Sequence, residues 1–173
     1  MGRPLTEEDI HKLHNFSLNE KTIFGTYAFE KYWEIDADFM FRVDNTVTIA
    51  KQIYGKKNGA FIVHDFNLLK HKKDSFHYAV NDHLCIAGDG HFVGIPPIEA
   101  YILFSKAGFR AFGWYPEWNN PGYHIDMRPQ DHISTWTAYY VREKGKQIQK
   151  YDNNLYSFIK ALKSDRSTVY NTV

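Results

Sequence analysis

The stretch Tyr123-His-Ile-Asp-Met-Arg128 decides the fold, because its residues alternate strictly between apolar and polar. Side chains of a β-strand point alternately to opposite faces of the sheet. One face of this strand is therefore apolar, while the other carries the imidazole of His124, the carboxylate of Asp126 and the guanidinium of Arg128. If the apolar face packs into a core, the polar face lines a groove. The pattern predicts a strand with a polar site beside it.

Helices and strands are expected on both sides of this stretch, without a regular alternation between them. A capping-box pattern starts at Thr6, Asn45 is a second capping residue, and Pro96-Pro97 and Gly108 are typical of the two ends of a third helix. We expect helices at 6–16, 45–54, 98–106 and 153–163, and strands at 60–66, 83–87, 109–114, 123–128 and 135–141. This mixture predicts the α+β class, with one domain over residues 1–173.

Composition excludes several classes of protein. The formal net charge is +1, and the basic runs at 56–57, 70–73 and 142–150 are short or scattered. A solvated face explains these runs better than a nucleic-acid site, which needs a concentrated basic surface. No apolar run has the length of a membrane span, and the first residues lack the apolar stretch of a signal peptide. We therefore expect no nucleic-acid partner, no membrane span and no export signal.

The one cysteine, Cys85, excludes an internal disulfide and a metal site built from several cysteines. Its apolar neighbours predict a buried, unreactive thiol. Aromatic residues make up 17% of the chain, which predicts a core of large side chains, an aromatic-lined groove, or both.

A second polar group precedes the strand expected at 83–87. The segment Asp74-Ser-Phe-His-Tyr-Ala-Val-Asn-Asp-His83 contains His77 and Asp82. Zinc takes imidazole and carboxylate ligands in a tetrahedron, and catalytic sites leave one position for water. Two ligands from this segment and His124 from the later strand meet that requirement. The sequence therefore predicts a Zn²⁺ site formed by His77, Asp82 and His124.

These segments resemble the zinc D-Ala-D-Ala carboxypeptidases and L,D-endopeptidases that cleave peptidoglycan stem peptides, a family that includes many phage endolysins. One part of the family signature is Gly-Phe…Gly-x-Tyr-Pro followed by His-x-Asp-x-Arg. Ala107-Gly-Phe-Arg-Ala-Phe-Gly-Trp-Tyr-Pro116 and His124-Ile-Asp-Met-Arg128 are similar to it, and Trp136 follows where the family often has tryptophan. The resemblance implies a small antiparallel sheet with flanking helices, of the hedgehog and D,D-peptidase kind, and a metal site within about 60–136.

The other part of the signature, Ser-x-His-x-x-Gly-x-Ala-x-Asp before a strand, has two alternative registers in this chain. His77 and Asp82 are five positions apart, two fewer than in the family, and the glycine is absent. His83 and Asp89 are six apart, one short. We prefer His77 and Asp82, because the serine of the signature and the apolar strand then fall in place. His64, in the strand before, is a third candidate ligand, with a plain hydrogen bond as its alternative role.

The catalytic groups of the family are incomplete in this chain. Val63-His-Asp-Phe66 occupies the region where members usually have an arginine, and Pro121-Gly122 stand where many have an acid or a second histidine. We expect Glu117 or Asp126 to be the general base that takes a proton from the attacking water. The alternative for Asp126 is to orient a ligand imidazole.

Substrate contacts are expected from two places. Arg128 is a candidate clamp for a substrate carboxylate, with a structural ion pair as the alternative. The aromatic side chains of Trp114, Tyr115 and Trp118 are expected to form one wall of the groove, or else to pack against the sheet edge.

The resemblance therefore implies a zinc-dependent peptidase that acts on peptidoglycan stem peptides, and it suits a protein made in the cytoplasm and encoded by a phage that attacks the wall of its host. Two other functions stay open. One is a non-catalytic zinc domain of the same fold, used for binding or as part of a phage particle, which the missing arginine and base favour. The other is a metal-free aromatic module that binds carbohydrate or cell wall.

Overall fold

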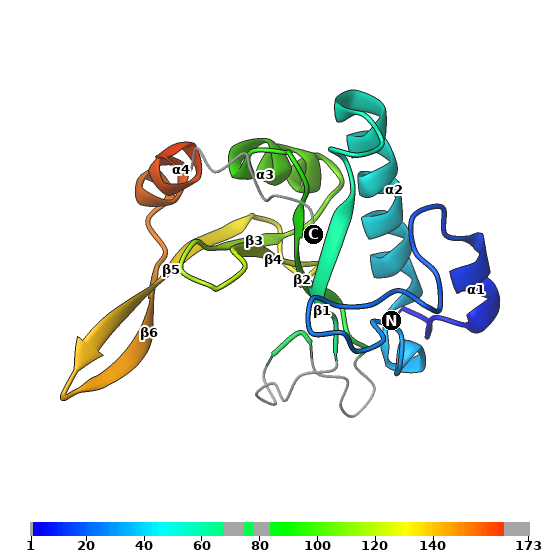
Figure 1. The fold of residues 1–173 in the computed structure, drawn as a ribbon, viewed down its shortest axis with the longest axis horizontal. Helices are drawn as coiled ribbons and strands as arrows, with labels where there is room; N and C mark the ends of the chain where they lie inside the picture. Colours follow the sequence, from blue (N-terminus) through cyan, green and yellow to red (C-terminus); the bar gives the residue numbers. More distant parts are fainter. Residues whose placement is uncertain (1, 68–74, 78–83, 165–173) are drawn as a thin grey trace.

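One six-stranded sheet organises the chain, and the strand that contains His124 lies in its interior (Figure 1). The computed structural model describes residues 2–67, 75–77 and 84–164 of the 173. The strands are β1 (Phe61–Asp65), β2 (Ala87–Phe92), β3 (Ala111–Tyr115), β4 (Gly122–Asp126), β5 (Ser134–Glu143) and β6 (Lys146–Asp152). Their order in the sheet is β1-β2-β4-β3-β5-β6. Neighbours are antiparallel except β3 and β5, which are parallel.

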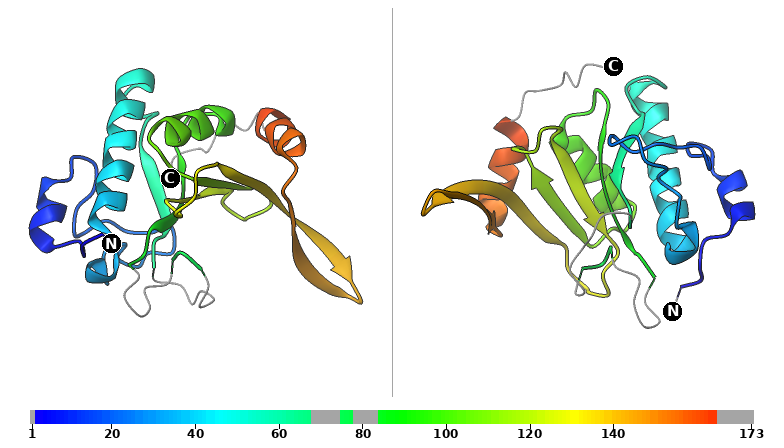
Figure 2. Two further views of the ribbon diagram at one scale, coloured as in Figure 1. Left: turned by 180° about the vertical axis from the view of Figure 1, so that it is seen from behind. Right: turned by 60° about the horizontal axis from the view of Figure 1, so that its bottom comes forward.

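Three of the helices lie along one face of this sheet, and the first helix in the chain lies beside the longest one, away from the strands (Figure 2). The helices are α1 (Glu7–Lys12), α2 (Ala37–Tyr54), α3 (Pro97–Lys106) and α4 (Leu155–Ser164), with a 3-10 turn at Tyr32–Glu34. Buried side chains of α2 and α3 pack with the apolar faces of the strands in one continuous core. Burial of a large apolar side chain such as Phe39 or Phe104, both without exposed surface, contributes about 2–3 kcal/mol. The arrangement confirms the α+β class and the mainly antiparallel sheet.

Two helix boundaries show how local capping decides where a helix begins. Thr6 and Asp9 form the predicted capping box of α1. Helix α2 begins at residue 37, not at 45 as expected, because Asp36 caps it: its Oδ1 accepts a hydrogen bond from the Phe39 backbone N–H at 3.0 Å. A cap of this kind contributes about 1 kcal/mol. Asn45 therefore lies inside the helix rather than at its start.

The strand expected at 83–87 lies further along the chain, as β2 at Ala87–Phe92. Gly88-Asp-Gly90, which follows the expected strand, lies inside β2. Both glycines have aromatic rings where a side chain would stand. A Cβ at Gly88 would lie 2.9 Å from Phe66 Cδ1, and one at Gly90 would lie 2.4 Å from Phe61 Cζ. Glycine is present here because the core approaches the strand closely, and Asp89 between them points to the opposite face.

Strands β5 and β6 form a long hairpin that projects from the sheet (Figure 1). The hairpin turns at Lys144 and Gly145, both at positive φ, as a two-residue turn requires. Strand β6 was not expected from the sequence. No helix in the described part of the chain is both long and apolar enough to cross a lipid bilayer.

Candidate metal centre

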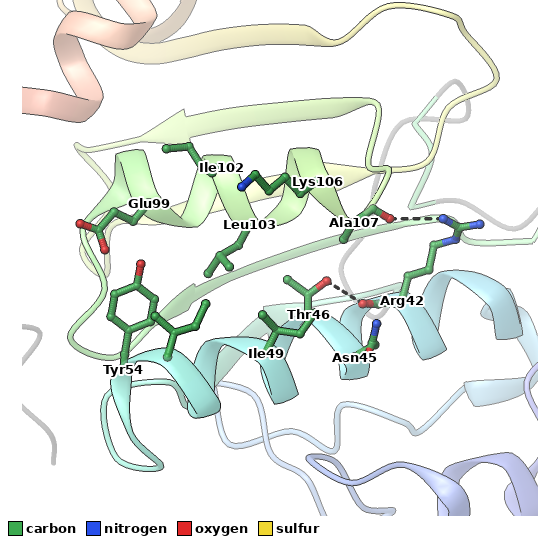
Figure 3. Close-up of a pocket in the computed structure, with 11 residues that line it drawn as sticks. Arg42, Asn45, Thr46, Ile49, Tyr54, Glu99, Ile102, Leu103, Lys106 and Ala107 are labelled. Atoms are coloured by element: carbon green, nitrogen blue, oxygen red, sulfur yellow. Dashed lines mark hydrogen bonds between the residues drawn. The ribbon is translucent and has the colours of Figure 1, made fainter.

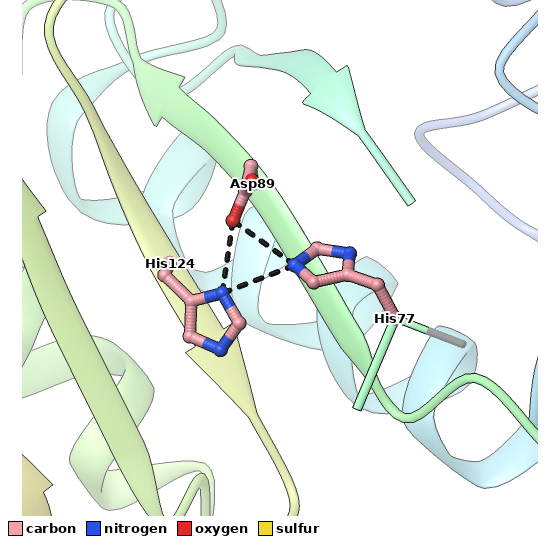
Figure 4. Close-up of side chains that lie close together, drawn as sticks. All are labelled: His77, Asp89 and His124. Atoms are coloured by element: carbon pink, nitrogen blue, oxygen red, sulfur yellow. Dashed lines mark hydrogen bonds and ion pairs between the residues drawn. The ribbon is translucent and has the colours of Figure 1, made fainter. Parts of the chain in front are cut away.

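Three metal-ligating side chains converge on the sheet face that lies opposite the core (Figure 4). Asp89 and His124 face each other from β2 and β4, and His77 reaches them from the short described segment 75–77. Their exposed fractions are 9%, 9% and 3%. The cluster therefore combines two imidazoles and a carboxylate in an almost fully buried position.

The spacing of the three ligand atoms matches a zinc tetrahedron. His77 Nε2 lies 3.1 Å from His124 Nδ1, and Asp89 Oδ1 lies 3.3 Å from the first and 3.0 Å from the second. Zinc bonds to N and O of 2.0–2.1 Å give a tetrahedron with edges of about 3.3 Å. The donor set and its spacing fit Zn²⁺ with one coordination position left over.

The far nitrogen of each imidazole is held by an acceptor, which assigns the tautomers. His77 Nδ1 contacts the carbonyl oxygen of Phe66, which can only accept, so Nδ1 carries the hydrogen. His124 Nε2 lies 2.9 Å from Asp126 Oδ2 and carries the hydrogen for the same reason. In the neutral rings, His77 Nε2 and His124 Nδ1 are then bare and point at a carboxylate oxygen. Three electron pairs that face one another favour a cation between them, and an acceptor on the far nitrogen is typical of histidines that bind a metal.

The charges around the cluster also favour a positive charge at its centre. Burial opposes protonation of His124, but the carboxylates of Asp126 and Asp89 outweigh it and raise its pKa to about 9. Burial alone would raise the pKa of Asp89, yet the charge of His77 and the bond to His124 hold it well below its usual range. The cluster thus attracts positive charge, as either a proton or a metal ion.

Asp126 orients His124 instead of facing the pocket. It has no exposed surface, and its carboxylate also accepts from Arg128 Nη2 at 2.5 Å and Nε at 2.9 Å. The Arg128 guanidinium lies over the rings of Phe76 and Trp136, 4.9 and 5.5 Å from their centroids. Arg128 therefore forms the structural ion pair that was the alternative to a substrate clamp. Asp126 contacts the His124 ring, which matches the alternative in which it orients that imidazole.

A pocket of about 620 Å³ opens beside Asp89. Its walls come from five parts of the chain: the segment Ile23–Phe24, the end of β1, the middle of β2, the turn 117–120 and the β5–β6 hairpin. The residues that line it are Ile23, Phe24, His64, Asp65, Asp89, Glu117, Trp118, Asn119, Asn120, Tyr140 and Gln147. Glu117 is exposed, and its Oε2 accepts from the Tyr140 backbone N–H at 2.8 Å. The candidate ligand Asp89 is therefore reached from an open groove.

The expected aromatic wall divides into two parts. Trp118 lines the pocket and stacks on Tyr115 at a centroid distance of 4.1 Å. Tyr115 also accepts a hydrogen bond from Trp136 Nε1 at 3.0 Å. The prediction for Trp114 is wrong: it has no exposed surface, because its side chain points from β3 into the core against Tyr123.

The aspartate of the cluster is Asp89, and it is paired with His77. Asp82 and His83 lie outside the described residues. The chain combines the histidine of one expected register with the aspartate of the other, twelve positions apart. A signal for this pairing was present, because Ala87-Gly88-Asp89 matches the Ala-x-Asp of the family signature once the segment before it is allowed to be longer.

Cys85 is buried, as the sequence predicted. The thiol is buried without exposed surface, and burial raises its pKa to about 12. An unreactive structural cysteine follows.

A second hollow lies between α2 and α3 (Figure 3). Its lining includes Ile49, Ile53 and Ile102, with Arg42 donating to the Ala107 carbonyl at 3.2 Å. No metal-ligating cluster in the described residues lies there. The groove is on the helical side of the sheet, away from the candidate centre.

Comparison with protein-family models, with curated proteins and with solved structures gave no match for this chain.

Proposed function

We propose that the protein is a zinc-dependent hydrolase that cleaves peptide bonds in peptidoglycan stem peptides, as a D,D-carboxypeptidase or an L,D-endopeptidase. The observation that carries the proposal is the convergence of His77 Nε2, Asp89 Oδ1 and His124 Nδ1 at 3.0–3.3 Å from one another. The substrate class comes from the resemblance of the segments around these residues to that peptidase family. A cell-wall target, and a phage origin, are part of the same proposal.

His77, Asp89 and His124 would hold the metal. When bound there, zinc polarises the carbonyl of the scissile bond and makes a nearby water a better nucleophile. The Phe66 carbonyl and Asp126 keep the two rings turned so that a nitrogen lone pair faces the centre. The groove beside Asp89 would receive the substrate, and Trp118 and Tyr140, which line it, would contact the substrate there.

Of the two carboxylates considered as general base, Glu117 is the better placed. It lines the groove, whereas Asp126 is buried and engaged by His124 and Arg128. Arg128 is also engaged, so a clamp for a substrate carboxylate is better sought elsewhere in the groove.

A non-catalytic zinc domain is the second candidate function, and one observation favours it. The side chains of the three candidate ligands are at most 12% exposed, and structural zinc sites are closed. In such a protein the metal would stabilise the sheet, and the groove would bind a partner without cleaving it.

Two measurements separate these functions. The first is the zinc content of the purified protein, for which we expect one zinc per chain and its loss in His124→Ala. The second is the release of new amino groups from purified peptidoglycan, which the wild type should produce and the variant should not. His132→Ala is the matched control, because the His132 side chain is 72% exposed.

Zinc bound in the wild type without any release of amino groups would favour the non-catalytic domain over the peptidase. Absence of zinc, together with unfolding that a chelator does not change, would rule out both and leave the metal-free binding module.

A further inference from the structure

A second pair of buried histidines lies next to the candidate metal centre on the same side of the sheet. His64 in β1 and His91 in β2 are 4% and 7% exposed, and His64 Nε2 lies 2.6 Å from His91 Nδ1. Neither belongs to the cluster of His77, Asp89 and His124. The pair needs an explanation, because buried imidazoles on a pocket wall are costly unless they are used or paired.

A β-bulge brings His64 into the groove. The pairing of β1 with β2 shifts between Val63 and Asp65, so that His64 and Asp65 together stand opposite Asp89. Bulges of this kind re-aim side chains and occur next to active sites. As a result, His64 lines the groove together with Asp65 and the candidate ligand Asp89.

The absence of a side chain at Gly122 leaves room for the His64 ring. A Cβ at Gly122 would lie 2.6 Å from His64 Cε1 and 3.0 Å from His64 Nδ1. Gly122 and His124 are two positions apart in β4, so that Cβ would stand on the same face as the ligand imidazole. The His64 ring therefore lies against Gly122, on the sheet face that carries the candidate metal ligands.

His64 has a nitrogen that is free to accept a proton. Its Nε2 is used by His91, and Nδ1 has no hydrogen-bond partner among the residues that the structure describes. Burial lowers the pKa of His64 to about 4, against an opposing effect of the Asp89 charge, so the ring is neutral at pH 7.

We propose that His64 is a catalytic residue of this site, the group that accepts a proton from the attacking water at Nδ1, and that His91 is its positioning residue. The proposal rests on the peptidase function proposed above. It assigns the general base to an imidazole from β1 in place of Glu117, whose carboxylate is exposed and bonded to the hairpin backbone.

The proton balance of the step is simple. The water oxygen bonds to the carbonyl carbon while one water proton moves to His64 Nδ1, and the ring becomes cationic. The Nε2–H bond to His91 Nδ1 then supports the charge. When the C–N bond breaks, the proton moves from Nδ1 to the leaving nitrogen. The products are a carboxylic acid and an amine, and His64 is neutral again.

The first test is the rate of amino-group release from purified peptidoglycan by His64→Gln, with zinc content measured on the same sample. We expect a full complement of zinc and a rate lower by about 10²–10⁴-fold, the usual contribution of a general base. His11→Gln, on the exposed α1 surface, is the matched control. Imidazole added to His64→Ala should restore part of the rate, because the vacated space next to Gly122 can hold it.

A wild-type rate in His64→Gln, or a larger loss in Glu117→Gln, would overturn the assignment of His64. An inactive wild type that binds zinc would instead refute the peptidase function itself, so the two failures are distinguishable.

The second test needs neither activity nor metal. Ring ¹⁵N spectra of the wild type at pH 7 should show His64 protonated at Nε2 and bare at Nδ1. The opposite tautomer would contradict the proposal, because Nδ1 could not then accept a proton. This measurement also covers the case in which the His64 variants fail to fold.

Discussion

Two pairs of buried imidazoles lie side by side on one face of the sheet, and they differ in what surrounds them. In both pairs the ring centroids are 4.9 Å apart. His77 and His124 share the carboxylate of Asp89, and His124 is also bonded to Asp126. His64 bonds only to His91 among the described residues.

The contrast in pKa follows from the carboxylates. Burial opposes the charged form at both His124 and His64. The carboxylates of Asp126 and Asp89 overcome it at His124, whose pKa rises to about 9, whereas at His64 burial prevails and the pKa falls to about 4. The surroundings of His124 therefore favour a positive charge, whereas those of His64 favour the neutral ring.

The largest expected effect comes from removal of the shared carboxylate. Asp89→Asn keeps the shape but leaves the two bare nitrogens without their charged partner. We expect zinc affinity to fall by more than about 100-fold, beyond the loss typical of an outer-sphere partner. Competition with a chromophoric chelator measures it, and Asp131→Asn, at a fully exposed side chain, is the control. Unchanged affinity would mean that zinc is held elsewhere.

The pH dependence of zinc binding is expected to be nearly as large. Below pH 9 the metal-free His124 is protonated, so zinc must displace a proton and bind more tightly as the pH rises. Affinity should increase about tenfold per pH unit between pH 6 and 8, roughly 100-fold in all. Calorimetry in buffers of different ionisation enthalpy should find about one proton released per zinc at pH 7. Binding without proton release would contradict the raised pKa of His124.

The sequence identified both histidines of the first pair, His77 and His124, as candidate ligands. It did not predict that His64 and His91 form a pair. The alternation at 123–128 predicted β4, and His124 lies in the candidate cluster as expected, because apolar and polar side chains alternate along a strand. His77 was also predicted. Asp89 was placed second, because the serine of the signature and the apolar strand fall in place with Asp82. The glycines on both sides of Asp89 are explained by the approach of the Phe66 and Phe61 rings from the core, which no local pattern reveals.

Other features depended on tertiary structure in the same way. His64 and His91 meet through a bulge between strands that are distant in sequence. Strand β6 has mostly polar, partly exposed residues on a projecting hairpin, so its sequence lacks the apolar alternation that identifies a strand. Of the side chains expected to form an aromatic wall, Trp118 lines the groove but Trp114 does not. The face of the strand on which a residue lies depends on the strand register.

A smaller effect is expected from the outer partner of His124. Asp126→Asn can still accept from His124 Nε2 but loses the charge that holds Arg128. We expect zinc affinity to fall by about 10–100-fold, measured by the same chelator competition. A loss as large as that of Asp89→Asn would indicate that Asp126 binds the metal directly.

The smallest expected effect comes from filling the space that Gly122 leaves for the His64 ring. The Cβ of Gly122→Ala would meet His64 Cε1 at 2.6 Å and should displace the ring, at a cost of about 1–3 kcal/mol in the free energy of unfolding. Zinc should be retained and hydrolysis reduced. Gly113→Ala is the comparison, since its Cβ would meet Trp136 instead. Equal activity losses in the two variants would show that strain on this face, rather than His64, is responsible.

The central claim, a zinc ion held by His77, Asp89 and His124, is tested most directly by a crystal structure of the zinc-loaded protein with data at the zinc absorption edge. The account predicts one anomalous peak at about 2.0–2.2 Å from His77 Nε2, Asp89 Oδ1 and His124 Nδ1. A zinc peak bonded to other side chains, or none at these three atoms in a protein that contains stoichiometric zinc, would contradict it.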